Sequence, residues 1–71
     1  MNISDSIMIL LRICGLRQLD LLTPLDMSSP QSLNNKFSGC RWSAEDLIKV
    51  ANATGTKLAF IFPDGKRMDL N

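Results

Sequence analysis

The spacing of the apolar residues changes once along this chain, at Gly55, and the change divides the fold into two parts. Before Gly55 the apolar residues recur every three or four positions, as in α-helices that bury one face. After it, segment 58–62 alternates as a β-strand does, and segment 63–70 supplies a Pro-Asp-Gly turn and an alternating return strand. We therefore predict a single, mainly α domain, helical over 2–55, with a C-terminal β-hairpin over 57–70.

Start and stop signals divide the helical part into four short helices. Asn2, followed by Asp5, is typical of a capping box, and Gly15 is a natural helix stop. Pro24 disturbs the second helix, because a proline inside a helix costs about 3 kcal/mol. The first helix is expected over about Ser4–Cys14, and the second begins near Arg17 and ends or kinks near Leu22.

The third expected helix has an exposed side made almost entirely of amides and hydroxyls. Ser29 is its cap, Pro30 its first residue and Gly39 its stop. Leu33 and Phe37 are four residues apart, so they share one face and can anchor the helix to a core. Side-chain amides pair with adenine edges in the major groove of DNA, whereas ordinary surface helices carry Glu and Lys. A base-reading helix and a poorly optimised surface helix both fit this segment, whose remaining polar residues are Gln31, Ser32, Asn34 and Asn35.

The fourth helix has a complete start signal. Ser43 is its cap, and Glu45 and Asp46 lie at the positive end of the helix dipole. Trp42 precedes the cap, and we expect it to pack onto Leu47 as a hydrophobic staple rather than to form a stacking platform.

Composition excludes several classes of function. The chain has 71 residues, a net charge of +1 and no histidine. Cys14 and Cys40 are the only thiols, so a four-ligand zinc site is not expected, and free, partly buried cysteines in a cytoplasmic protein are the default. No glycine-rich phosphate loop or nucleophile–base pair is visible, and therefore we expect no enzyme, cofactor or small-molecule site. The apolar run 7–11 is too short for a membrane span and is expected to be a buried helix segment rather than a signal peptide.

The order of these elements resembles the lambda-repressor/Cro-like (XRE-type) helix-turn-helix family of small bacterial and phage regulators. The resemblance covers nearly the whole chain. The chain departs from the family by having Leu22 where alanine is usual, Asp26 where glycine is usual, the atypical Pro24, and one extra residue before Leu33. These departures predict a distorted second helix. The resemblance is carried by Gly15-Leu16-Arg17-Gln18 with Leu21, Met27-Ser28-Ser29-Pro30-Gln31-Ser32-Leu33, Lys36-Phe37-Ser38-Gly39, Trp42 to Ala51, Gly55 and Lys57-Leu58-Ala59-Phe60.

The resemblance implies a transcriptional regulator that binds double-stranded DNA through its third helix. Gln31 and Asn35 lie where family members contact bases, with Ser32 next to them. Gln18 matches a residue that commonly touches a phosphate. Around it, Arg17, Lys36 and Arg41 are expected to clamp the DNA backbone.

Two further alternatives are open at this level. Strand edges of the hairpin can pair across a two-fold axis, giving a homodimer that buries Phe60, Phe62 or Met68, or the hairpin can simply cover the helical core. The fold can also serve a protein-binding adaptor or inhibitor of a mobile element, since a fold does not fix a function and the charge is close to neutral.

Overall fold

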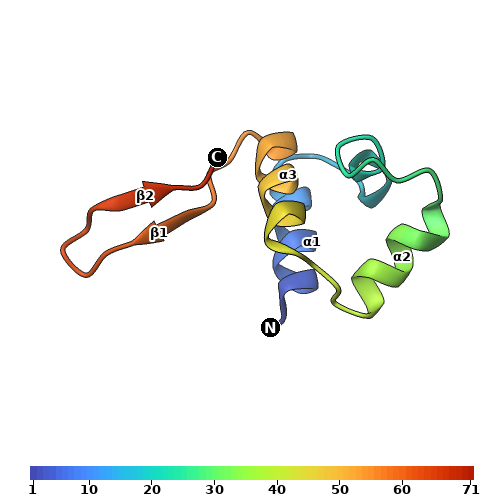
Figure 1. Ribbon diagram of the computed structural model, residues 1–71. Coiled ribbons are helices and arrows are strands. Elements are labelled where there is room, and N and C mark those ends of the chain that lie inside the picture. The colour runs from blue at the N-terminus through green and yellow to red at the C-terminus, as the bar shows by residue number, and fades with distance from the viewer.

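A computed structural model describes all 71 residues and shows a mainly helical chain that ends in an antiparallel hairpin (Figure 1). The second expected helix is a single 3₁₀ turn, so the chain has three α-helices and not the predicted four. The elements are α1 (Ile3–Ile13), η1 (Gln18–Leu21), α2 (Pro30–Ser38), α3 (Ala44–Thr54), β1 (Ala59–Ile61) and β2 (Arg67–Asp69).

The predicted helix starts at Asn2 and Ser43 are confirmed. The Asn2 side chain accepts the N–H of Asp5 at 2.9 Å, and the Asp5 carboxylate accepts the N–H of Asn2 at 3.3 Å. The hydroxyl of Ser43 accepts the N–H of Asp46 at 3.1 Å, and the Asp46 carboxylate accepts the N–H of Ser43 at 3.0 Å. Each reciprocal pair satisfies two backbone donors that a bare helix end would leave without a partner.

Pro24 explains why the second element is so short. Proline has no N–H to continue a helical ladder, and η1 ends at Leu21. The chain then turns through Asp26, which has a left-handed φ of 55°. The N–H of Asp26 bonds to Thr23 O at 3.0 Å and the N–H of Met27 to Leu22 O at 2.8 Å, which is the hydrogen-bond pattern of a Schellman motif.

The left-handed residue after α2 is also not a glycine. α2 stops at Gly39 as predicted, but Gly39 has a right-handed φ of −86°. Cys40 carries the left-handed φ, 51°, and its N–H bonds to Phe37 O at 3.3 Å. The N–H of Arg41 bonds to Lys36 O at 3.0 Å, so two consecutive bonds close the end of α2.

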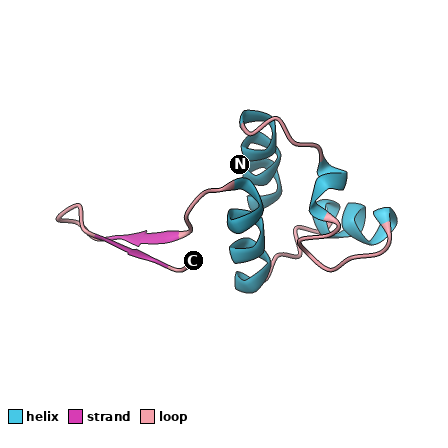
Figure 2. Cartoon of the chain, turned by 90° about the horizontal axis from the view of Figure 1, so that it is seen from above, coloured by secondary structure: helices cyan, strands magenta, loops and turns pink.

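The core lies where α1, η1, α2 and α3 meet, and it is small. Leu33 is completely buried and Phe37 packs against the same cluster, which confirms both as the anchors of α2. α1 and α3 run alongside each other in the middle of the molecule, and α2 lies at one end (Figures 1 and 2). The buried apolar residues are Ile7, Leu11, Leu21, Leu25, Leu33, Val50 and Ala51.

A buried hydroxyl joins α1 to α2 and to the segment before α3. Ser4 is 8% exposed, and its Oγ donates to Phe37 O at 2.7 Å and accepts from Trp42 Nε1 at 3.0 Å. The Trp42 ring meets the Phe37 ring edge to face, with centroids 4.8 Å apart. Trp42 and Leu47 both pack against the core, which confirms Trp42 as a packing residue. Its specific partners are Ser4 and Phe37, and the staple onto Leu47 stays a prediction.

The hairpin does not cover the helical core, so that predicted alternative is wrong. β1 and β2 pair antiparallel with Phe60 opposite Met68, and the pair projects from the end of α3 away from α2 (Figures 1 and 2). The chain therefore has extents of 42 × 21 × 21 Å. Phe60, Phe62 and Met68 are 62%, 44% and 53% exposed.

Three composition-based expectations are refined by the structure. None of the helices has the length and apolar character needed to cross a lipid bilayer. Cys14 and Cys40 are free, as expected, but both are exposed rather than partly buried. The apolar run 7–11 is not buried throughout, because Ile9 is 45% exposed.

Candidate nucleic-acid interface

The orientation of α2 follows from its one fully buried side chain. Leu33 points into the core, and Ser29 caps the helix by accepting the N–H of Ser32 at 3.3 Å. With the helix held in this rotation, one surface carries only amides and a hydroxyl. All four predicted polar residues are exposed, namely Gln31, Ser32, Asn34 and Asn35.

The amides on this surface are paired with one another. Gln31 Nε2 donates to Asn35 Oδ1 at 3.1 Å, one helical turn along α2. Gln18 Nε2 donates to Asn34 Oδ1 at 2.5 Å and so joins η1 to α2. After these bonds, Gln31 still has a free Oε1 and one free N–H, and Asn35 still has its amide donors. The pairs therefore orient the amides and leave hydrogen-bonding groups directed at solvent.

Two shallow hollows flank Asn35. The first, of about 490 Å³, is lined mainly by polar residues, which include Gln18 from η1 and Asp5 from α1. The second, of about 310 Å³, is lined by Met27, Ser32, Asn35, Lys36 and Arg41. Asn35 lines both, so the predicted base-contacting residues Gln31, Ser32 and Asn35 lie on one continuous polar surface.

The four predicted phosphate contacts are not equivalent in the structure. Lys36 Nζ lies 2.8 Å from Asp46 Oδ2, donates to Arg41 O at 3.1 Å and sits 5.6 Å from the centre of the Trp42 ring. Its side chain is 20% exposed, so the ammonium is partly buried and is held by these contacts. Its contact with a phosphate stays a prediction that requires this ion pair to open.

Arg17 and Arg41 are the cations beside α2 that have no ion pair. Both residues are exposed, and Arg17 precedes η1 while Arg41 follows α2. Gly39 leaves room for the Arg41 side chain, because a Cβ at Gly39 would lie 3.0 Å from Arg41 Nε. Asp5 lines the first hollow, and the Asp20 carboxylate accepts the backbone N–H of Arg17 at 2.7 Å, so the two free positive charges around α2 have two negative charges nearby.

The ion pair of Asp46 gives folding a testable dependence on pH. Burial alone would raise the pKa of the Asp46 carboxyl, but hydrogen bonds from Lys36 and Ser43 and the charge of Lys36 outweigh it and lower the pKa. A carboxyl with a lowered pKa stabilises the fold above its unfolded-state pKa of about 4, and this contribution is lost as the pH falls through the folded-state pKa. We expect the free energy of unfolding to fall below about pH 4.

The control for this prediction is Asp46→Asn, which keeps an oxygen for the helix cap and removes the charge. Urea denaturation of both proteins between pH 2 and pH 7 measures the effect. The variant should be less stable at pH 7, and the difference between the two proteins should vanish in acid. A difference that stays constant with pH would contradict the assignment.

Sequence reasoning identified the positions of the amides but missed three long-range contacts that join α2 to the rest of the chain. Asn34 pairs with Gln18 across sixteen positions, Asp46 holds Lys36 across ten, and Ser4 bonds to Phe37 O across thirty-three. The only sequence signal was the number of amides on α2. The partners lie on other elements, so no local pattern shows them.

Comparison of the chain with protein-family models, curated proteins and solved structures gave no match. The family resemblance and the site roles that it implies therefore stay predictions.

Proposed function

We propose that this protein is a sequence-specific double-stranded DNA-binding regulator, acting as a homodimer and reading the major groove with α2. The observation that carries the proposal is the amide surface of α2, with Gln31 and Asn35 paired and exposed. In the proposed complex η1, the turn through Asp26 and α2 act as a helix-turn-helix unit.

The packing of η1 against α2 supports a helix-turn-helix arrangement. Leu21 of η1, Leu25 of the turn and Leu33 of α2 are buried in one core cluster. The left-handed Asp26 lies at the position where the resembled family has glycine, and it turns the chain between the two elements. The bond from Gln18 to Asn34 fixes the start of η1 against the exposed side of α2.

The hydrogen-bonding capacity of Gln31 suits an adenine edge. Adenine presents the N7 acceptor and the N6 donor in the major groove, and one amide can satisfy both. Gln31 keeps its oxygen and one N–H free while its other N–H bonds to Asn35. Asn35 therefore holds Gln31 in place for this contact and presents its own amide donors to a neighbouring base. Ser32 lies beside them at the edge of the second hollow.

Salt dependence tests the proposal, because each phosphate contact releases counterions. The preferred sequence is first selected from a random duplex library, and affinity is then measured by fluorescence anisotropy between 50 and 300 mM salt. Arg17 and Arg41 from two copies give four contacts, so the slope of log K against log salt should be about −3.6, and about −5.4 if Lys36 also leaves Asp46.

Arg41→Gln tests one of these phosphate contacts. It removes two contacts from a dimer, so the magnitude of the slope should fall by about 1.8, and the selected sequence should stay the same. Lack of enrichment of any duplex and lack of binding at 50 mM salt would overturn the regulator proposal.

A protein-binding adaptor is the second candidate. Asp5 beside the amide surface and the internal ion pair of Lys36 leave little positive charge near α2. This observation favours a partner with hydrogen-bonding groups and no phosphates. Absence of DNA binding in the experiment above would favour this candidate.

A further inference from the structure

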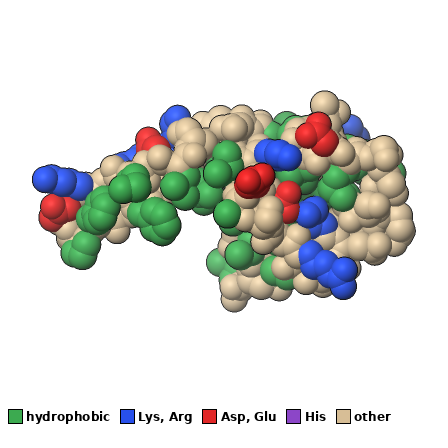
Figure 3. All heavy atoms as spheres, in the orientation of Figure 1, with side chains coloured by type: hydrophobic (Ala, Val, Ile, Leu, Met, Phe, Trp, Pro, Cys, Tyr) green, Lys and Arg blue, Asp and Glu red, His purple; other side chains and the backbone are tan.

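One face of the hairpin is apolar and largely exposed to solvent. In a hairpin, two residues that lie opposite each other point to the same side of the sheet. Every second residue along a strand also points to that side. Because Phe60 lies opposite Met68, the register assigns five apolar residues to one face. Figure 3 shows hydrophobic side chains over much of the hairpin, and they continue onto the adjoining helices. This face, called the arm face below, consists of Leu58, Phe60, Phe62, Met68 and Leu70.

The opposite face of the hairpin has a different character. It carries Ile61 and an ion pair in which Arg67 Nη2 lies 2.9 Å from Asp69 Oδ1. Two isolated strands are marginally stable in water, and their stability comes from packing one face against something else. The arm face is the side that has apolar area to bury.

The base of the hairpin is held so that the arm face cannot fold back onto its own helices. The Asn71 side chain donates to Asn52 Oδ1 at 2.8 Å and to Thr56 O at 3.0 Å, and accepts the N–H of Leu58 at 2.7 Å. Lys57 Nζ also donates to Asn71 O at 2.9 Å. These bonds tie both strands to the end of α3 and fix the direction in which the hairpin projects. In this direction the arm face has no cover from the helices of its own chain.

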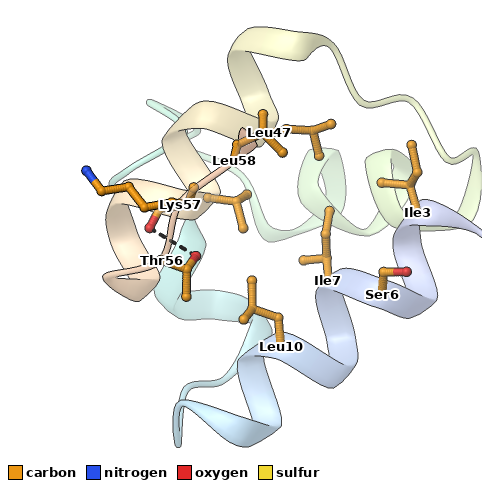
Figure 4. A pocket seen from close by; sticks show the side chains of 10 residues that line it. Ile3, Ser6, Ile7, Leu10, Leu47, Thr56, Lys57 and Leu58 are labelled. Carbon is orange, nitrogen blue, oxygen red and sulfur yellow. Dashed lines mark hydrogen bonds between the residues drawn. The ribbon is translucent and has the colours of Figure 1, made fainter. Parts of the chain in front are cut away.

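An apolar groove begins where the arm begins. The groove has a volume of about 250 Å³ and lies between α1, α3 and the segment that leads into β1. Figure 4 shows Ile3, Ile7 and Leu10 of α1 facing the groove, with Leu47 and Leu58 on its other wall. Leu58 belongs both to the groove and to the arm face, so the two surfaces are continuous. We refer to this surface as the α1/α3 groove.

The arm is long enough to cover the groove. The α1 wall of the groove runs from Ile3 to Leu10, eight residues, which at 1.5 Å per residue makes a groove about 12 Å long. The arm strand from Leu58 to Phe62 has five residues, which at about 3.4 Å per residue spans about 17 Å. One arm can therefore cover the full length of one groove.

We propose that the protein forms a two-fold dimer by reciprocal arm exchange, in which the arm face of each copy packs into the α1/α3 groove of the other. Because arm and groove are continuous on one side of the chain, a two-fold axis beside Leu58 places each arm over the partner's groove. Such an isologous contact closes at two copies. Arm exchange rests on the proposed function only in assuming a homodimer. It leaves α2 of both copies exposed, because α2 and the arm lie at opposite ends of the molecule (Figure 1).

The area available favours a second copy. Phe60 and Phe62 are 62% and 44% exposed, which together amounts to about one whole aromatic side chain, or roughly 200 Å². Met68 and Leu70 are 53% and 41% exposed and add a similar area, so the two arms of an exchanged dimer together bury on the order of 800 Å², to which the groove walls add. Pairing of hairpin edges alone leaves the groove uncovered and leaves part of the arm face exposed.

Two pairs of variants test the two halves of this interface. Phe60→Glu places a charge on the arm face, and Ile61→Glu places the same charge on the opposite face at a residue that is 74% exposed. Ile3→Glu places a charge in the groove, and Ile9→Glu is its control, because both isoleucines lie on α1 and both are 45% exposed. Sedimentation equilibrium of the full chain should show that Phe60→Glu and Ile3→Glu each weaken the dimer by at least ~30-fold, since each would bury an unpaired charge. The two controls should remain dimeric.

Mixing the two dissociated variants distinguishes arm exchange from any other dimer. A heterodimer of Phe60→Glu with Ile3→Glu contains one arm–groove contact that is intact on both sides and one that carries both charges. The mixture should therefore form heterodimers at concentrations where each variant alone is monomeric. Far-ultraviolet circular dichroism of each variant checks that the helices remain folded.

Each other outcome overturns the proposal. A wild-type chain that is monomeric at all concentrations, or a dimer that survives Phe60→Glu, removes the arm from the interface. A dimer that is weakened by Phe60→Glu but not by Ile3→Glu indicates pairing between hairpins. The absence of heterodimers in the mixture indicates the same. DNA binding by a monomeric chain would leave standing the proposal that α2 reads DNA while the homodimer and arm exchange fail, so the two are separable.

Discussion

Replacing Gln31 and Asn35 together with alanine is expected to abolish sequence preference while leaving non-specific DNA binding intact. Each bidentate amide–base contact contributes about 1–3 kcal/mol of discrimination, so the double variant should lose about 2–6 kcal/mol per half-site. That range corresponds to at least a ~30-fold loss of preference for the selected duplex over a scrambled one. The measurement is a competition between these two duplexes by fluorescence anisotropy.

The structure explains why the fold should tolerate this change. Gln31 and Asn35 are exposed, their hydrogen bond is to each other, and alanine has a higher helix propensity than either residue. Truncating both partners leaves no buried polar group unsatisfied. The salt dependence of non-specific binding should also stay the same, because the arginines proposed to contact phosphates are retained.

Asn34→Ala is the matched control on the same helix. Asn34 is also an exposed amide, but it bonds to Gln18 and is not among the proposed base-contacting residues. The control should keep the selected sequence. If Asn34→Ala lost the preference, or if the double variant kept it, the assignment of base contacts to Gln31 and Asn35 would be wrong.

The features that sequence predicted correctly are those encoded by neighbouring residues. The caps at Asn2 and Ser43 each depend on four consecutive residues, and the hairpin depends on alternation and a short turn signal. The burial of Leu33 follows from its spacing with Phe37. The distortion around Pro24 was also expected, although its result, a single 3₁₀ turn, was not.

The features that sequence missed depend on pairs of residues far apart in the chain. The ion pair between Lys36 and Asp46 joins α2 to α3, and nothing local distinguishes Lys36 from a free surface lysine. The direction of the hairpin depends on Asn71 bonding to Asn52 and Thr56, which only the folded chain brings together. The positions on the candidate site were therefore predictable, whereas the charges available to it were not.

Leu33→Ala is expected to have the largest effect on stability. Leu33 is completely buried between α2 and the other helices, and truncation of a buried leucine to alanine costs about 2–5 kcal/mol, through lost burial and the cavity left behind. A domain of this length has a total stability of roughly 4–10 kcal/mol. The variant should therefore lose a large part of its stability, and α2 should lose its fixed orientation. Urea denaturation followed by circular dichroism measures this loss.

Two further variants show whether the loss comes from packing at this position. Leu33→Met keeps most of the volume and should cost less than about 1.5 kcal/mol. Leu19→Ala removes a leucine of η1 that is 51% exposed, so its effect should be much smaller than that of Leu33→Ala. All proteins are compared at one concentration, at which the wild-type chain is monomeric, because association would add to the apparent stability. If Leu33→Ala unfolded at the same urea concentration as Leu19→Ala, α2 would not be anchored by the core. The fixed orientation of its amides, on which the proposed base reading depends, would then have no physical basis.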